Sequence, residues 1–131
     1  MPLRLLVVDD EAGIAKAIGL AVRQLGIEFQ TVADPLEAVE RFIEYCPDIL
    51  MIDMIMPGKD GVDVLHEILS TGIPSRIVLT SGYGDTYLRL GRGIARFHGA
   101  ENPMLLPKPF RREELIGVLG GLVDAATPPP G

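Results

Sequence analysis

The 131-residue sequence predicts an α/β domain with a five-stranded parallel sheet and helices on both faces. Four short apolar runs, at residues 5–8, 49–52, 77–79 and 104–106, and a weaker one at 29–32 indicate strands that start at positions 3, 29, 49, 76 and 104, so that successive starts are 20 to 28 residues apart. Continuous apolar runs are typical of parallel strands that are covered on both faces, and each interval is long enough for one helix. Right-handed connections between such strands distribute the helices over both faces of one sheet.

The first and third intervals carry clear helix signals. The first holds a stripe of apolar residues that ends before the helix stop Gly26: Ile14, Ile18, Ala21, Val22 and Leu25. In the third, Asp60 is a capping residue ahead of apolar positions at helical spacing: Val62, Leu65, Ile68 and Leu69. Both segments therefore predict amphipathic helices that pack on the sheet.

The second interval predicts a capped helix. Asp34 precedes Pro35, which suits the first helical position, and Glu37 follows three residues after the cap. We expect this helix to end before Pro47 and to keep Cys46 as a small buried residue. Its expected core side chains are Val39, Phe42 and Ile43.

The last two helices are predicted with weaker signals, because glycine costs about 1 kcal/mol relative to alanine inside a helix. Gly91 and Gly93 interrupt an apolar stripe made of Leu90, Ile94 and Phe97. The final helix contains Gly117, Gly120 and Gly121. We expect one domain over residues 1–123, followed by a proline-rich tail or linker over residues 124–131.

Composition narrows the class of protein. The single cysteine excludes a disulfide within the chain and favours a reducing compartment. Met1 leads directly into an apolar run, and no apolar stretch has the length of a membrane span, so we expect a cytoplasmic protein without membrane contact.

Acidic residues are concentrated in the first part of the chain. The net charge is −8 over residues 1–75 and +2 over residues 76–131. Direct binding of nucleic acid by this domain is not expected, because phosphate neutralisation requires a basic surface. The excess of carboxylates instead favours a cation site.

Polar side chains follow four of the predicted strands. They are Asp9 and Asp10 after the first, Asp53 at the end of the third, Thr80 at the end of the fourth and Lys108 after the fifth. Ligands of parallel α/β sheets bind beyond the carboxyl ends of the strands, so these side chains are expected to converge there.

The types of side chain predict the chemistry. Three close carboxylates repel one another, and a hard cation such as Mg²⁺ relieves that repulsion. With the charge neutralised, Asp53 is a candidate nucleophile toward a phosphoryl group. Thr80 and Lys108 supply a hydroxyl and an ammonium group that can bind phosphoryl oxygens.

Four segments carry these residues: residues 7–11 (VVDDE), 48–53 leading into 56–61 (MPGKDG), 79–82 (LTSG) and 107–110 (PKPF). Together they resemble the receiver domains of two-component response regulators, over residues 3–123. The resemblance implies a flavodoxin-like (βα)5 fold with strand order 2-1-3-4-5.

The resemblance also implies roles for the site residues. Asp53 is the phosphoacceptor, and Mg²⁺, which Mn²⁺ can replace, is held by Asp9, Asp10, Asp53 and the backbone carbonyl of Ile55. Thr80 is the switch hydroxyl and Lys108 pairs with the phosphoryl group.

The partners implied by the resemblance are a histidine kinase or phosphotransfer protein and a downstream output domain or protein, with a homodimer linked to phosphorylation as a further expectation. Such a domain assists its own phosphorylation and dephosphorylation but is not a conventional turnover enzyme. The sequence leaves open whether the chain acts alone, as a phosphorelay adaptor or ahead of an output domain.

The segment between Tyr83 and Pro103 departs from the family pattern. Thr80 and Lys108 are 28 positions apart, more than the resemblance predicts, and the position three before Lys108, often aromatic in the family, is Leu105. Tyr83 and Tyr87 are the candidate substitutes for that ring. We expect phosphorylation to change this segment without an aromatic switch at 105.

Several of these residues also have a simpler, structural interpretation. Arg89, Arg92 and Arg96 form either a solvated face paired with acids or an altered output surface. Taken singly, Asp9 and Asp10 also suit helix capping. The methionines at 51, 54 and 56 are expected to pack in the core, His66 to lie on the surface, and His98 has no assigned role.

Two other functional classes fit the sequence less well. A Mg²⁺-dependent phosphohydrolase with an aspartyl-phosphate intermediate commonly has a second Asp two residues after the nucleophile, and here that residue is Ile55. Ile55 and Gly82 also offer no side chain that could orient an attacking water. A flavin-binding module is disfavoured, because the acids at 9–11 would repel a phosphate in the first loop.

Overall fold

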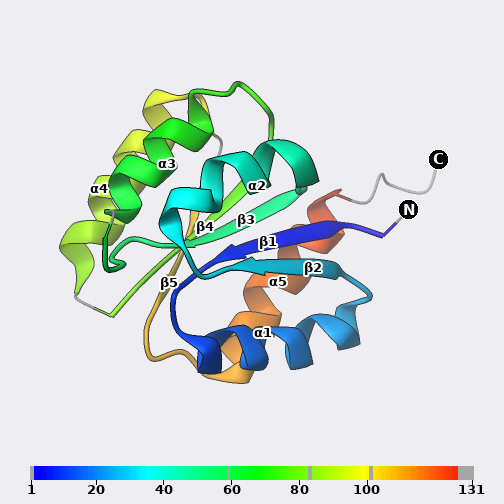
Figure 1. Cartoon of the computed structure of the whole chain (residues 1–131). Helices are drawn as coiled ribbons and strands as arrows, with labels where there is room; N and C mark the ends of the chain where they lie inside the picture. The colour runs from blue at the N-terminus through cyan, green and yellow to red at the C-terminus, as the bar shows by residue number, and fades with distance from the viewer. Residues whose placement is uncertain (1, 59, 83, 101, 127–131) are drawn as a thin grey trace.

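The computed structural model describes residues 2–58, 60–82, 84–100 and 102–126, in which strands and helices alternate along the chain (Figure 1). The strands are β1 (Arg4–Val8), β2 (Glu28–Val32), β3 (Ile49–Asp53), β4 (Arg76–Ser81) and β5 (Met104–Pro107). The helices are α1 (Ala12–Leu25), the short 3₁₀ turn η1 (Pro35–Glu37), α2 (Ala38–Tyr45), α3 (Gly61–Leu69), α4 (Asp85–Phe97) and α5 (Arg112–Ala126).

The strands form one parallel sheet in the order β2-β1-β3-β4-β5. Helices α1 and α5 cover one face, and α2, α3 and α4 cover the other (Figure 1). The predicted α/β class, the parallel sheet and the strand order are therefore confirmed. All carboxyl ends of the strands lie at one edge of this sheet, where ligands of such folds bind.

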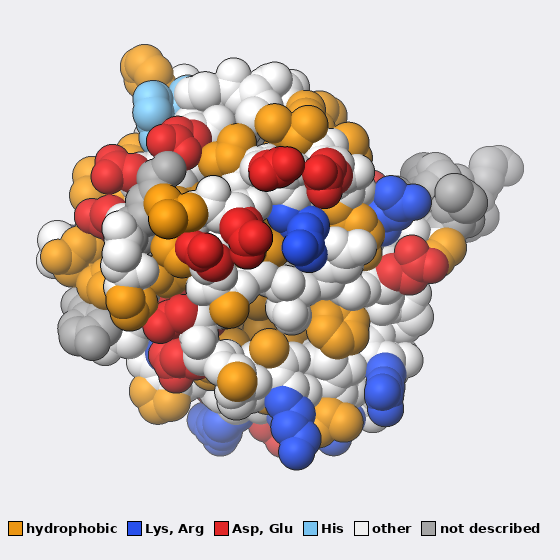
Figure 2. Space-filling view, viewed as in Figure 1, with side chains coloured by type: hydrophobic (Ala, Val, Ile, Leu, Met, Phe, Trp, Pro, Cys, Tyr) orange, Lys and Arg blue, Asp and Glu red, His pale blue; other side chains and the backbone are white. Residues whose placement is uncertain are grey.

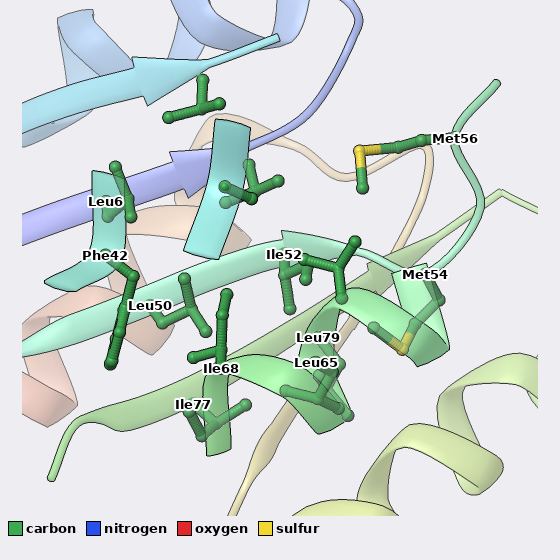
Figure 3. Packing of buried hydrophobic residues seen from close by; sticks show 14 of the residues in the cluster. Leu6, Phe42, Leu50, Ile52, Met54, Met56, Leu65, Ile68, Ile77 and Leu79 are labelled. Carbon is green, nitrogen blue, oxygen red and sulfur yellow. The ribbon is translucent and has the colours of Figure 1, made fainter. Parts of the chain in front are cut away.

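Alternation along the central strands divides the core into two layers. Leu5 and Val7 of β1 pack with α1 and α5, whereas Leu6 and Val8 pack with the helices of the other face. Figure 3 shows the second layer, in which side chains of β3 and β4 meet those of α2 and α3. Every residue of β3 is buried, as expected for a central strand covered on both faces.

Two predicted helix boundaries are confirmed by their backbone geometry. Gly26 ends α1 in the left-handed conformation, with a φ of 68° that glycine adopts without steric cost. Asp60 caps α3, because its Oδ1 accepts a hydrogen bond of 3.1 Å from the backbone N–H of Val62.

The second helix differs from its prediction in two respects. Asp34 does cap the segment, accepting a 2.9 Å hydrogen bond from the N–H of Leu36, but the first turn is the 3₁₀ turn η1 and α2 follows it. Phe42 is buried, whereas Ile43 is 48% exposed, so its predicted burial is wrong. Adjacent helical residues point about 100° apart, and the face that carries Phe42 takes the contact with the sheet.

The prediction that Cys46 is buried is also wrong, because this residue is exposed. Cys46 ends α2 in the left-handed conformation, with a φ of 49°. Its Sγ donates a 3.2 Å hydrogen bond to the carbonyl oxygen of Ile43 instead of packing among apolar side chains.

Of the apolar stripe that the sequence predicts for α4, Ile94 packs against the core, but the other two members do not. Leu90 and Phe97 are 49% and 84% exposed. The residues buried against the sheet and α3 are instead Leu88, Gly91 and Ala95. A Cβ at position 91 would lie 2.6 Å from Sδ of Met54 and 2.9 Å from Cδ1 of Leu79, so this glycine allows close packing of the helix.

The last helix extends beyond the predicted domain boundary. Helix α5 continues to Ala126, so residues 124–126 of the expected tail are helical, and residues 127–131 lie outside the described residues. Within the described residues, no helix combines the length and the apolar character that crossing a membrane requires.

Candidate functional site

Strand register brings the predicted site residues together at the carboxyl edge of the sheet. Val8 pairs with Ile52, so Asp9 emerges beside Asp53, and Asp53 pairs directly with Thr80 on β4. Asp9, Asp53 and Thr80 are 5%, 4% and 1% exposed, respectively, in a molecule whose other buried residues are mostly apolar. Burial of two carboxylates is costly, so each must be compensated by its surroundings.

The three predicted acids form a cluster. Carboxylate oxygens of Asp9, Asp10 and Asp53 all lie within 4.8 Å of one another, with Asp10 exposed and the other two buried. This set of hard oxygen donors is of the type that binds Mg²⁺ or a similar divalent cation. Figure 2 shows acidic side chains spread over much of the visible face of the molecule.

The ammonium group of Lys108 lies among these acids. Its Nζ is 2.8 Å from Oδ2 of Asp9, 3.0 Å from Oδ2 of Asp53 and 3.1 Å from Oε1 of Glu11. The Lys108 backbone N–H donates to the carbonyl oxygen of Ser81 at 2.9 Å, which fixes the loop after β5 against the end of β4. The lysine partly neutralises the cluster, but the acids around it outnumber it.

The carboxylates of Asp9 and Asp53 have the same pattern of contacts. Oδ2 of each contacts Lys108, while Oδ1 accepts a backbone hydrogen bond, from Glu11 to Asp9 at 2.9 Å and from Ile55 to Asp53 at 3.1 Å. The Ile55 backbone therefore lies against Asp53, whereas the ligand role of its carbonyl stays a prediction. Both side chains are held in fixed orientations by this pattern.

Burial and hydrogen bonding have opposing effects on the pKa values of both Asp53 and Lys108. Burial raises the pKa of Asp53 above its ordinary value of 3.8, and the nearby Asp9 adds to this, although the Ile55 N–H and Lys108 act in the opposite direction. For Lys108, burial lowers the pKa, but hydrogen bonds to Asp9 and Asp53 outweigh it and the net pKa is raised. The lysine is therefore a permanent cation in the site.

A depression of about 330 Å³ gives access to the cluster. It is lined by Asp10, Glu11, Asp53, Ile55, Met56, Pro57, Gly82 and Lys108. Thr80 lies beneath this surface, and its Oγ1 donates to the carbonyl oxygen of Ile52 at 3.5 Å, the outer limit for a hydrogen bond. The hydroxyl is thus weakly held beside Asp53.

Two further residues join this region. Glu11 contacts Lys108, a contact that the motif at residues 7–11 does not predict. The available sequence signal is its position directly after Asp9 and Asp10. Tyr87 on α4 is half-buried and lines a second depression of about 350 Å³ that shares Ile55 and Met56 with the first. Tyr83, the other candidate substitute for the aromatic ring, lies outside the described residues.

Other predicted residues have structural positions. The methionines at 51, 54 and 56 are buried in the core, as predicted. Leu105 is partly buried against the layer that contains Leu79. Arg89 pairs with Asp85 one turn earlier at 3.5 Å, and both side chains are more than 70% exposed (72% and 73%), which favours the solvated-face interpretation for that arginine.

Comparisons with known proteins agree with this geometry. The family model of the response regulator receiver domain matches residues 5–119. The response regulator MprA of Mycobacterium sp. (strain KMS) is 30% identical over 131 residues, which are 100% of this chain and 55% of that protein. Protein-glutamate methylesterase/protein-glutamine glutaminase 5 of Myxococcus xanthus is 40% identical over 86 residues, covering 64% of this chain and 25% of that protein.

Solved structures show the same fold. The receiver domain of a LuxO repressor protein from Vibrio parahaemolyticus superposes with a TM-score of 0.81 at 22% identity, over 96% of this chain and 93% of that one. The chain spans about half the length of the response regulator that it matches (55%). From the family match, the strand order and the acids that converge at the strand ends, we conclude that this chain belongs to the response regulator receiver domain family, whose members are signalling domains.

Proposed function

We propose that Asp53 accepts a phosphoryl group from the phosphohistidine of a histidine kinase or phosphotransfer protein. The observation that supports this most is the position of Asp53: its carboxylate is buried, opens onto a depression and is bridged at 3.0 Å by the Lys108 ammonium. The burial that raises the pKa of Asp53 also makes its ionised carboxylate more basic and therefore a better nucleophile.

The donor set fits Mg²⁺, and Mn²⁺ can replace it. The oxygens of Asp9, Asp10 and Asp53 lie within 4.8 Å of one another, and we assign the fourth protein ligand to the backbone carbonyl of Ile55. When bound, the cation would neutralise negative charge on the transferring phosphoryl group. The excess of acids over the one lysine ammonium among them supports the need for such a cation.

The reaction requires little covalent chemistry from the chain. A carboxylate oxygen of Asp53 attacks phosphorus, the new P–O bond forms as the P–N bond to the donor histidine breaks, and the imidazole leaves with a proton from solvent. Ile55 N–H and Lys108, at 3.1 Å and 3.0 Å from the two Asp53 oxygens, orient the attacking carboxylate. Positioning and charge compensation are the contributions of the fold.

After transfer, Thr80 and Lys108 are the groups that detect the phosphoryl group. Lys108 can exchange its contact with Oδ2 of Asp53 for a phosphoryl oxygen without leaving Asp9. The Thr80 hydroxyl gives up only a 3.5 Å hydrogen bond to Ile52 when it turns toward the same group. These small rearrangements begin the conformational change.

Helix α4 is the element that we expect to transmit the change. It begins shortly after Thr80, and Gly91 lies directly against Met54, the residue that follows Asp53. Amide exchange with and without a phosphoryl mimic tests this, with altered protection expected between residues 84 and 100. Unchanged protection throughout that segment would contradict the role of α4.

We further propose that this domain assists its own phosphorylation and dephosphorylation and is not a conventional turnover enzyme. The side chains of Ile55 and Gly82, at the rim of the depression, carry no group able to donate or accept a proton. The alternative of an aspartyl-phosphate phosphohydrolase needs such a group two residues after the nucleophile.

We propose the partners that membership of the family suggests. A histidine kinase or phosphotransfer protein supplies the phosphoryl group, and an output domain or protein receives the signal, with a phosphorylation-linked homodimer as one route. In this proposal the receiver domain comprises residues 1–123 together with residues 124–126, which complete helix α5. A cytoplasmic location, without direct contacts to nucleic acid or membrane, completes the proposal.

The proposal is tested by incubating the chain with a small phosphodonor such as acetyl phosphate. Intact-mass measurement should detect one added phosphoryl group with Mg²⁺ and none with a chelator. Asp10→Asn should raise the Mg²⁺ concentration required, while Asp63→Asn, an exposed acid on α3, should not. Absence of uptake at any Mg²⁺ concentration, or uptake that is indifferent to the chelator, would overturn the proposal.

A further inference from the structure

The two histidines of the chain, 32 positions apart in sequence, lie side by side on the surface. Nδ1 of His66, on α3, is 3.0 Å from Nε2 of His98, at the end of α4. Their ring centroids are 4.9 Å apart and the rings are tilted by 59°. Figure 2 shows histidine side chains exposed at the top left of the molecule, where the ends of α3 and α4 lie in Figure 1.

Helical hydrogen bonds hold the backbones of both residues, and the Ser70 N–H donates to the carbonyl oxygen of His66 at 3.0 Å. The His98 backbone N–H donates to the carbonyl oxygen of Ile94 at 3.1 Å, and the ring meets Phe97 edge-on at 5.5 Å. His66 is exposed, so its ring can rotate about its side-chain bonds. The pair therefore combines a half-buried imidazole at position 98 with an exposed imidazole at position 66.

The pair lies away from the phosphoacceptor pocket. His98 lines a cavity of about 560 Å³ together with Asp48, which precedes β3, and Arg76, at the start of β4. These residues mark the amino ends of the strands, whereas Asp53 and Lys108 lie at the carboxyl ends. The cavity also gives solvent and ions access to His98.

The spacing of the two nitrogens matches that of ligands bound to one metal ion. Imidazole–metal bonds are about 2.0–2.1 Å, so two nitrogens in adjacent positions of a square-planar or octahedral ion lie about 2.9 Å apart, and in a tetrahedral ion about 3.4 Å apart. The observed 3.0 Å is close to the first value. The rings are tilted rather than stacked. Chelation requires the exposed His66 ring to turn until both lone pairs point to one ion.

We propose that His66 and His98 chelate one divalent late transition-metal ion of the Cu²⁺, Ni²⁺ and Zn²⁺ class, with Cu²⁺ bound most tightly. Binding requires His66 to carry its proton on Nε2 and His98 on Nδ1, which leaves the two facing nitrogens free to coordinate. Water fills the other coordination positions. The bound ion then links α3 to the end of α4 in place of the hydrogen bond between His66 and His98.

The two sites of the molecule differ in how well they bind Mg²⁺. The acidic cluster offers hard oxygen donors, which suit Mg²⁺, whereas the histidine pair offers imidazole nitrogen, which Mg²⁺ binds poorly and Cu²⁺ binds well. Excess Mg²⁺ should consequently leave the histidine pair free for Cu²⁺. This difference allows each site to be measured in the presence of the other.

The test uses Cu²⁺ as probe on the full chain carrying Cys46→Ser, because the exposed thiol of Cys46 would reduce Cu²⁺. With excess Mg²⁺ present, titration should show one Cu²⁺ bound per chain. Electron spin-echo spectra should contain the remote nitrogens of two imidazole rings. Since the chain has two histidines in all, these signals identify the ligands without ambiguity.

Single substitutions separate chelation from adventitious binding. His66→Gln and His98→Gln should each weaken Cu²⁺ binding by about tenfold or more and leave the signal of one imidazole. Asp53→Asn should bind Cu²⁺ as the parent does. An equimolar mixture of the two His variants should still show one imidazole per ion, because the chelate forms within one chain.

A thermal readout is independent of the spectra. Zn²⁺ should raise the unfolding temperature of the parent and have a smaller effect on either His variant, since a ligand that binds only the folded state stabilises it. The proposal is overturned by a parent spectrum with fewer than two imidazoles, by His variants that bind Cu²⁺ as tightly as the parent, or by recovery of the two-imidazole signal in the mixture.

Discussion

The Nζ atom of Lys108 lies 3.0 Å from Oδ2 of Asp53, and the same ammonium group contacts Asp9 at 2.8 Å. One cation thus compensates two buried carboxylates, with Glu11 at 3.1 Å as a third partner. The arrangement is sensitive to the loss of the lysine, because removal of one member of a buried ion pair leaves uncompensated charge.

Replacement of Lys108 by methionine should therefore destabilise the fold by about 3 kcal/mol in the absence of divalent cations. Mg²⁺ should restore more stability to this variant than it adds to the parent, because the cation then compensates carboxylates that have lost their ammonium. Urea unfolding with and without Mg²⁺ measures both effects. Lys16→Met, at an exposed position on α1, is the control. Equal stability of parent and Lys108→Met at all Mg²⁺ concentrations would contradict the compensating role.

Asp53→Asn should have the opposite effect on stability. The folded-state pKa of Asp53 is raised above 3.8 by burial, so its ionisation disfavours folding at neutral pH. The neutral amide of the Asp53→Asn variant does not carry the cost of a buried charge. We therefore expect the free energy of unfolding to increase by about 0.5–2 kcal/mol, as is common when a functional residue that destabilises the fold is replaced. The gain should diminish as the pH falls through the folded pKa toward about 4, where the parent carboxyl is protonated as well. Unfolding free energies of both proteins across this pH range provide the test. A stability difference that does not change with pH would argue against the ionisation of buried Asp53 as its cause.

Much of the fold was predictable because its signals are local. Buried runs specify the central strands, and cap residues such as Gly26 and Asp60 specify helix ends. Helix faces were less predictable, because the choice between two apolar stripes depends on packing. Helix α4 turns Leu88 and Gly91 inward and leaves Leu90 exposed, an orientation set by the close fit to Met54 and Leu79.

For the site, the sequence predicts which residues converge but not all of their side-chain contacts. Parallel strands bring their carboxyl ends to one edge, so the convergence of Asp9, Asp53 and Lys108 follows from the topology once the strands are known. The contact between Glu11 and Lys108 depends on side-chain orientation, which sequence spacing does not define. The pairing of His66 with His98 depends on how α3 packs on α4, and no motif signals it.

Two glycines of α4 provide a matched test of its orientation. Gly91→Ala should destabilise the protein by about 1–3 kcal/mol, because the new methyl group meets Met54 and Leu79. Gly93→Ala should instead stabilise it by about 0.5–1 kcal/mol, since nothing lies within 4 Å of its added Cβ and alanine favours the helix. Thermal or urea unfolding compares them. Similar effects of the two substitutions would mean that α4 does not pack as described.

The rim residue Ile55 should influence how long the aspartyl phosphate survives. Ile55→Asn places an amide beside Asp53 that can hydrogen-bond a water, and we expect the phosphorylated form to be lost several-fold to about tenfold faster. Ile55→Val retains an apolar side chain and should leave the rate close to that of the parent. The decay is followed by intact mass after removal of the phosphodonor, and an unchanged rate in Ile55→Asn would count against a role for this position.

The central claim is that Asp53 carries the phosphoryl group, and chemical mapping of the modified residue tests it most directly. Borohydride reduction converts an aspartyl phosphate to homoserine, which peptide mass spectrometry locates in the sequence. After reaction with acetyl phosphate and Mg²⁺, homoserine should occur at position 53 in the parent and be absent from Asp53→Asn, while Asp63→Asn should match the parent. Homoserine at another acid in the parent, or equal phosphoryl uptake by the parent and Asp53→Asn, would contradict the claim.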